Sequence, residues 1–278
     1  MRHAWIVVGA LLLLSHRVHG QRSTQVMVGG RAVEVIRMGT GSPTLVLESG
    51  AGEGVSGWRR ILPRLAQHTS VIAYSRRGHG ASAPSAAPGS PTESVEELHA
   101  LLTALRVRGP ILLGGHSFGG LLARLYVSRY PQDVAGLLLV DATHESQFAR
   151  WGTLEPQFRI LDTIRAMLPN LPPAVRDDQR QILEIASTES VPGMRPLPDI
   201  PLAIITATQP CAPDREFVCR DPRAIAAWRA MHDEWFAGAS VGLRLVSNRT
   251  SHYVMNDQPE LVIESLRFLL GATRRRQE

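Results

Sequence analysis

The chain has 278 residues, of which 44% are hydrophobic and 20% charged, so it can bury the core of one large domain. Its 30 basic residues are all arginine, and the formal net charge is +5. Apart from Arg274–Arg276 these arginines are scattered, whereas nucleic-acid binding calls for a stripe or face of positive charge. Composition therefore argues against a nucleic-acid-binding protein.

The first twenty residues are typical of a secretory signal peptide. Arg2 precedes an apolar run from Ala4 to Leu14, which is shorter than the ~20 apolar residues that span a bilayer. We expect cleavage after Gly20. Residues 1–20 then form the signal peptide, and the mature protein is secreted or periplasmic without stable membrane insertion.

The only two cysteines, Cys211 and Cys219, lie eight positions apart in a stretch rich in proline and charge. In an exported protein they favour a disulfide, and two free thiols are the alternative. No histidine lies nearby to complete a metal site, and we expect no metal.

From residue 25 onward, predicted strands alternate with predicted helices. Gly29-Gly30 favours a hairpin between the first two strands. The expected strands are 25–28, 31–37, 44–48, 70–74, 111–113, 134–140, 202–208 and 241–246. The expected helices are 56–67, 93–107 with Thr92 as cap, one directly after Ser117, one from Pro222 and 257–270. The alternation predicts an α/β fold, with a mostly parallel eight-stranded sheet covered on both faces and an antiparallel edge.

The alternation stops between residues 145 and 200, where amphipathic pieces over 158–168 and 176–186 are separated by prolines. We interpret residues 145–200 as an inserted helical lid, called the helical insert from here on. The α/β core then comprises residues 21–144 and 201–272, followed by a basic tail over 273–278.

Ser117 lies at the corner between the strand that begins at Ile111 and the following helix, in the stretch "GHSFG". This G-x-S-x-G pattern between a strand and a helix is typical of a nucleophile elbow, whose glycines avoid clashes across the turn. The helix also directs its free N–H groups at the same place. The alternative is an ordinary glycine turn.

A serine hydroxyl needs a base to become a nucleophile. His252 is our candidate, because it lies in the loop between the last strand and the last helix, at the end of the sheet where ligands gather. His116 is adjacent to Ser117, so we expect its side chain to point away from the position of the base.

The base in turn needs a carboxylate that fixes its tautomer. Asp141 ends the apolar strand "VAGLLLVD", where a buried carboxylate requires a partner. Asp214 follows a later strand in a stretch that resembles solvated loop. We favour Asp141 and keep Asp214 as the alternative.

An oxyanion formed during acyl transfer requires two preorganised N–H donors. We expect one from Phe118, directly after the serine, and one from Ala51 in "ESGAGEG", where small residues let the backbone approach a substrate. A glycine loop without such a role is the alternative.

From about Val26 to Leu270 the chain resembles the α/β-hydrolase family, through "LVLESGAGEG", "YSRRGHGAS", "GGHSFGG", "VAGLLLVDATHES" and "SHYVMNDQPELVIESL". The resemblance implies Ser117 as nucleophile, His252 as base, and Asp141 or Asp214 as acid, in the family's order. Many members have His-Gly where this chain has Ser49-Gly50, and the usual acid position carries Thr208-Gln209-Pro210.

We therefore expect an exported serine hydrolase that cleaves a small-molecule carboxylic ester, or an amide or thioester, through an acyl-enzyme without a cofactor. An aminopeptidase of the same fold would need a carboxylate in the helical insert, such as Glu155 or Glu184. An esterase would need only apolar walls, such as Trp151, Phe158 and Leu161. An acyltransferase and an inactive ligand-binding protein are further alternatives.

Overall fold

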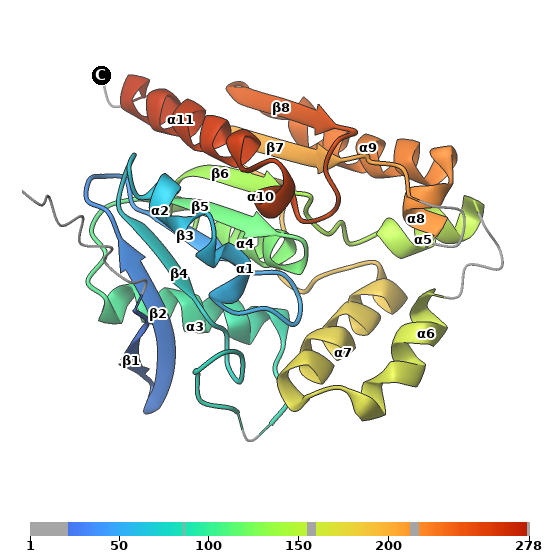
Figure 1. Cartoon of the computed structure of the whole chain (residues 1–278), viewed down its shortest axis with the longest axis horizontal. Coiled ribbons are helices and arrows are strands. Elements are labelled where there is room, and N and C mark those ends of the chain that lie inside the picture. Colours follow the sequence, from blue (N-terminus) through green and yellow to red (C-terminus); the bar gives the residue numbers. More distant parts are fainter. Residues whose placement is uncertain (1–21, 86, 155–159, 212–216, 277–278) are drawn as a thin grey trace, which may run out of the picture.

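The computed structural model describes residues 22–85, 87–154, 160–211 and 217–276. Eight strands form one twisted sheet in the order β1-β2-β4-β3-β5-β6-β7-β8 (Figure 1). Their bounds are β1 Thr24–Val28, β2 Arg31–Met38, β3 Leu45–Glu48, β4 Val71–Tyr74, β5 Ile111–His116, β6 Val134–Val140, β7 Leu202–Ala207 and β8 Gly242–Ser247. The eight predicted strands are thus confirmed to within a few residues at each end.

Strands β3 to β8 all run in parallel, and β1 and β2 add an antiparallel edge. The hairpin turn at Gly29-Gly30 has positive φ angles at both glycines, as a two-residue turn of this kind requires. The predicted α/β class is confirmed. Because β3 to β8 are parallel, their carboxyl ends meet at one edge of the sheet, and that edge carries the candidate site.

Helices cover both faces of the sheet, because the strands carry apolar side chains on each side. Helices α3 (Pro91–Ala104) and α4 (Phe118–Arg129) lie on one face. Helices α1 (Ser56–Arg59), α2 (Leu62–Leu65) and α11 (Pro259–Arg275) lie on the other. The two cores share no residue, so each face is closed independently.

The helical insert contains α5 (Gln147–Leu154), α6 (Ile160–Met167) and α7 (Pro173–Thr188). It lies beyond the carboxyl ends of the parallel strands, with α8 (Phe217–Arg220) and α9 (Pro222–Ala237) nearby (Figure 1). Within the described ranges it contains no strand, as the sequence predicted. No helix of the described residues is long and apolar enough to cross a bilayer.

Three helix predictions were wrong in detail. The helix expected over 56–67 is two single turns, α1 and α2. Helix α3 begins earlier than expected, because Ser90 and Glu93 form a capping box and Pro91 occupies the first turn, so Thr92 is not the cap. The last helix, expected over 257–270, is α11, which begins at Pro259 and continues to Arg275, and a separate turn, α10 (Val254–Asp257), precedes it.

Candidate active site

Ser117 stands between β5 and α4 with φ 53° and ψ −125°, a positive-φ conformation that few residues other than glycine adopt. The turn is tight enough to exclude side chains beside it. A Cβ atom at Gly115 would lie 2.4 Å from the Gly119 carbonyl oxygen, and one at Gly119 would lie 2.5 Å from the Ser49 carbonyl oxygen. These contacts give the physical reason for glycine on both sides of Ser117.

Asp141 follows β6 with φ 43°, and its carboxylate is buried among three donors. His252 Nδ1 lies 2.7 Å from one carboxylate oxygen. The other oxygen accepts hydrogen bonds from Trp228 Nε1 at 2.7 Å and from the Ala207 backbone N–H at 2.9 Å. Burial alone would raise the pKa of Asp141, but the hydrogen bond and charge of His252 outweigh it, and the pKa is lowered.

The contact between Asp141 and His252 fixes the tautomer of the imidazole. A charged carboxylate accepts hydrogen bonds only, so Nδ1 carries the proton and Nε2 carries the lone pair that a base uses. Asp214, the alternative acid, lies outside the described residues.

Sequence reasoning missed two side chains of α9, one that bonds Asp141 and one that bonds the next residue, Ala142. Trp228 donates to the carboxylate directly. His232 donates from Nε2 to the Ala142 carbonyl at 2.9 Å and bonds Thr206 through Nδ1. Burial lowers the pKa of His232 to about 4, so the ring is neutral. Helical spacing could have predicted that both face the core, but not which carboxylate or carbonyl they would meet.

The expected orientation of His116 was wrong. Its ring lies 4.6 Å from the His252 ring, centroid to centroid, and its Nε2 donates to the His252 carbonyl at 2.9 Å. The reason is strand alternation: Leu112 and His116 share one face of β5, and α10 and α11 cover that face with the loop that carries His252. His116 therefore holds the loop of the candidate base.

Ser117, His252 and Ala51 line one cavity of about 710 Å³ at the carboxyl edge of the sheet. Phe118 is the first residue of α4, and the first N–H groups of a helix have no acceptor within it. Ala51 lies in the glycine-rich loop (residues 49–54) that follows β3. The structure thus brings both expected oxyanion donors close to Ser117 in the fold.

The walls of the cavity are largely apolar and come from the helical insert, α8 and α9. The described residues that form these walls include Phe148, Trp151, Ile160, Ile164, Ile182, Val218 and Trp228. Trp151 is thus a wall residue, as expected. Leu161 is not among the lining residues, because Ile160 and Ile164 occupy the inner face of α6, and Phe158 lies outside the described residues.

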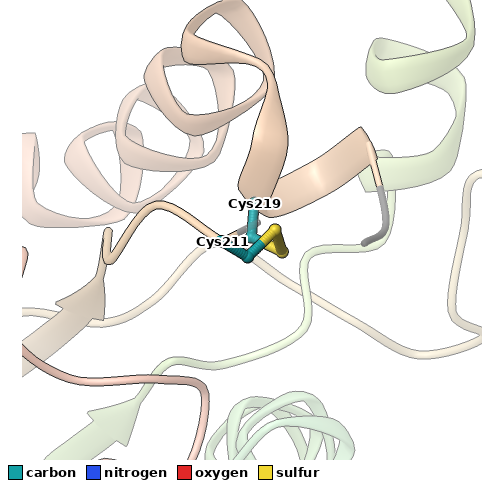
Figure 2. The surroundings of a disulfide bond; sticks show 2 residues. All are labelled: Cys211 and Cys219. Carbon is teal, nitrogen blue, oxygen red and sulfur yellow. A yellow bond between two sulfur atoms is a disulfide. The ribbon is translucent and has the colours of Figure 1, made fainter. Parts of the chain in front are cut away.

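A disulfide joins Cys211 and Cys219, with 5.3 Å between their Cα atoms. Figure 2 shows this bond between the loop that follows β7 and the short helix α8. Both cysteines line the cavity, so the bond fixes part of its rim. Of the two alternatives left by the sequence, the structure contains the disulfide.

Within the described ranges, no group of three or more His, Cys, Asp or Glu side chains is arranged to hold a metal ion. The arrangement consists of an elbow serine, a histidine–aspartate pair and backbone N–H groups at one edge of a parallel sheet. It is the arrangement that defines the α/β-hydrolase class. Comparison with known proteins leads to the same class.

The chain belongs to the alpha/beta hydrolase family, whose model matches residues 45–265. Among curated relatives, YqjL of Bacillus subtilis, an uncharacterized protein, is 30% identical over 105 residues, which cover 38% of this chain and 42% of that protein. The 2-hydroxy-6-oxo-2,4-heptadienoate hydrolase of Pseudomonas putida is 33% identical over 129 residues, which cover 45% of this chain and 46% of that enzyme. These matches span less than half the length of either relative.

Solved structures agree with the fold over the whole domain. An esterase from Thermogutta terrifontis has a TM-score of 0.61 at 19% identity, covering 91% of this chain and 99% of its own. The enol-lactonase from Burkholderia xenovorans LB400 has a TM-score of 0.59 at 15% identity, covering 89% and 100%. At these identities the likeness establishes the fold alone.

Proposed function

We propose that the protein is an exported serine hydrolase that cleaves a neutral carboxylic ester with an apolar acyl group. One observation carries this proposal. His252 Nδ1 contacts Asp141, and both residues line the same cavity as Ser117. Membership of the alpha/beta hydrolase family supports it.

In the proposed reaction, His252 Nε2 takes the proton of Ser117 as the serine oxygen attacks the ester carbonyl. The backbone N–H groups of Ala51 and Phe118 stabilise the oxyanion. His252 then gives the proton to the leaving alcohol, and an acyl group remains on Ser117. A water molecule that loses a proton to the same ring releases the acid and restores the serine.

The lining of the cavity supports a neutral substrate. Among the described residues that form it, none is an arginine, whereas Glu53 and Asp141 contribute carboxylates. An anionic acyl group would therefore face negative charge without a cationic partner. The name of the Pseudomonas putida relative specifies a carboxylate substrate, and a cavity of this kind favours a different one.

The aminopeptidase alternative receives less support. Glu184 is exposed on α7 and is not among the described residues that line the cavity. Glu155 lies outside the described residues.

Export, the other part of the proposal, is supported by the disulfide between Cys211 and Cys219, since disulfides persist in oxidising compartments. The predicted signal peptide lies outside the described residues. Expression of the whole chain with its N-terminus, followed by fractionation and N-terminal sequencing, tests this part. We expect the mature chain outside the cytoplasm, beginning at Gln21, and an intact cytoplasmic chain would contradict export.

A panel of p-nitrophenyl esters tests the substrate class. Straight acyl chains of two to twelve carbons are compared with a succinyl half-ester of similar length. We expect kcat/KM to be at least about tenfold higher for the neutral ester, because the cavity offers an extra carboxylate no counter-charge. Ser117→Ala abolishes turnover, and Ser187→Ala, on the exposed side of α7, serves as the matched control. Equal or better turnover of the succinyl ester would contradict a neutral substrate.

A further inference from the structure

The buried side chain of Arg76, in the loop after β4, holds the glycine-rich loop and α7 together. Its Nη1 donates to the Ser49 carbonyl at 2.6 Å and to Glu48 at 3.1 Å. Its Nη2 donates to the Gly50 carbonyl at 2.8 Å and to Asp178 of α7 at 2.9 Å. One guanidinium thus binds two successive carbonyls of the glycine-rich loop and a carboxylate of the helical insert.

These bonds orient the peptide plane between Gly50 and Ala51. In a trans peptide the C=O and N–H groups point in opposite directions. Since the Gly50 carbonyl points toward Arg76, the Ala51 N–H points away from it. In the described part of the chain this N–H has no hydrogen-bond acceptor, and Ala51 lines the cavity whereas Arg76 does not.

The next peptide is held by the partner of Arg76. The Gly52 N–H donates to Asp178 at 2.9 Å, and the same carboxylate oxygen lies 3.0 Å from His79 Nε2. The Ala51 N–H therefore faces the cavity side of the loop, whereas the Gly52 N–H is bonded to Asp178 of the helical insert. A rotation of either peptide would break at least one bond to Arg76 or Asp178.

Stability alone does not account for this cluster. Arg76 and Asp178 are each about 5% exposed, and a buried ion pair is often no more stabilising than apolar side chains of the same volume. What such a pair does supply is a fixed orientation of the groups bonded to it. Arg76 also lies with its Cζ 5.6 Å from the centroid of the Phe118 ring, so it contacts Phe118 as well as the carbonyl of the peptide that carries the Ala51 N–H.

We propose that Arg76 and Asp178 are positioning residues that aim the Ala51 N–H at the oxyanion of the tetrahedral intermediate. The inference rests on the proposed function, and it makes α7 part of the reaction machinery rather than only a wall of the cavity. Asp178 acts through Gly52, and Arg76 through the Gly50 carbonyl.

The test compares Arg76→Lys and Asp178→Asn with Arg124→Lys as the matched control. Lysine keeps the charge but not the planar fork that binds several acceptors at once. Arg124 is a buried arginine of α4, paired with Glu145 at 2.6 Å, and it does not line the cavity. The readouts are kcat, KM and the inhibition constant of a boronic acid, whose tetrahedral adduct on the serine resembles the intermediate.

For Arg76→Lys and Asp178→Asn we expect kcat to fall about 10- to 100-fold with KM changed less than about threefold, because an oxyanion donor acts on the transition state. Boronic acid affinity should fall by a similar factor. Arg124→Lys should lower thermal stability without weakening the binding of the boronic acid. Circular dichroism establishes folding, and if Arg76→Lys does not fold, Asp178→Asn decides.

Losses no larger than those of Arg124→Lys, or a rise in KM at constant kcat, would overturn the inference while the proposed function stands. A wild-type protein that turns over no ester and binds no boronic acid would contradict the proposed function and the inference together.

Discussion

Asp141 is buried, yet every described contact of its carboxylate favours the charged form. His252, Trp228 and the Ala207 N–H together donate to both oxygens, so the carboxylate is ionised without being solvated. The sequence allowed the prediction of Asp141, because a carboxylate that ends an apolar strand must find a partner. Trp228 could not be predicted, because its contact depends on how α9 packs across the end of β7.

We predict that Asp141→Asn lowers kcat by about two to four orders of magnitude, because an amide neither fixes the tautomer of the His252 imidazole nor stabilises its protonated form. Kinetics on the best ester of the panel and circular dichroism measure the effect. Asp199→Asn, which alters an exposed carboxylate paired with Arg276, is the control and should leave kcat unchanged. Full activity in Asp141→Asn together with loss in Asp214→Asn would reverse the assignment of the acid.

At the scale of elements, the turn between β5 and α4 is the tightest constraint on the site. The pattern G-x-S-x-G predicted this turn correctly, because the close approach of Gly115 and Gly119 to backbone atoms leaves few other solutions. The orientation of His116 could not be read from the same pattern, since it depends on which helix covers that face of β5. The cap of α3 was misplaced because Ser90 and Thr92 are both good capping residues, and the reciprocal bond with Glu93 decides between them.

We predict that Gly119→Ala destabilises the protein by about 1–3 kcal/mol, because its Cβ would meet backbone atoms of residues 48 and 49 at 2.5–2.6 Å. Gly152→Ala is the matched control: it lies in α5 with nothing within 4 Å of its Cβ, and alanine is the better helix former by about 1 kcal/mol. Urea unfolding measures both. An unchanged midpoint of urea unfolding for Gly119→Ala would contradict the clash that we expect at this turn.

The Asp178 carboxylate attaches helix α7 to the glycine-rich loop, and the contacts that it makes there keep it ionised. Burial opposes the charge of Asp178, but Arg76 and His79 outweigh it and lower its pKa from 3.8 to about 2. A carboxyl whose pKa is lower in the folded state stabilises the fold above its unfolded pKa. That stabilisation is lost as the pH falls through the folded pKa. The helical pattern of residues 176–186 could predict α7 but not this partner across the fold.

We predict that the wild type loses roughly 2 kcal/mol from Asp178 between about pH 5 and pH 2, as the shift in pKa implies. Asp178→Asn lacks this contribution, so the difference in unfolding free energy between the two proteins should shrink toward acid. Urea unfolding at pH 7, 4 and 2.5 measures the difference, with Asp162→Asn, exposed on α6, as the control. A difference in unfolding free energy that does not change with pH would contradict the conclusion that Asp178 is ionised and paired in the folded protein.

At the scale of the whole molecule, the candidate site exists because parallel strands end at one edge. Ser117 after β5, Asp141 after β6 and the loop after β8 meet there although they are far apart in sequence. Strand and helix alternation was enough to predict that meeting. The cavity beyond it could not be predicted, because its walls come from the helical insert, α8 and α9, and helical periodicity predicts such helices but not how they pack against one another.

The proposed serine nucleophile is tested most directly by covalent labelling of the mature protein with a fluorophosphonate, followed by mass spectrometry of the intact chain and its peptides. We expect one phosphonyl group per chain, on Ser117, with none on Ser117→Ala and labelling of His252→Ala slowed by at least about a hundredfold. Absence of label, label on another serine, or His252→Ala reacting at the wild-type rate would contradict a serine nucleophile activated by this histidine.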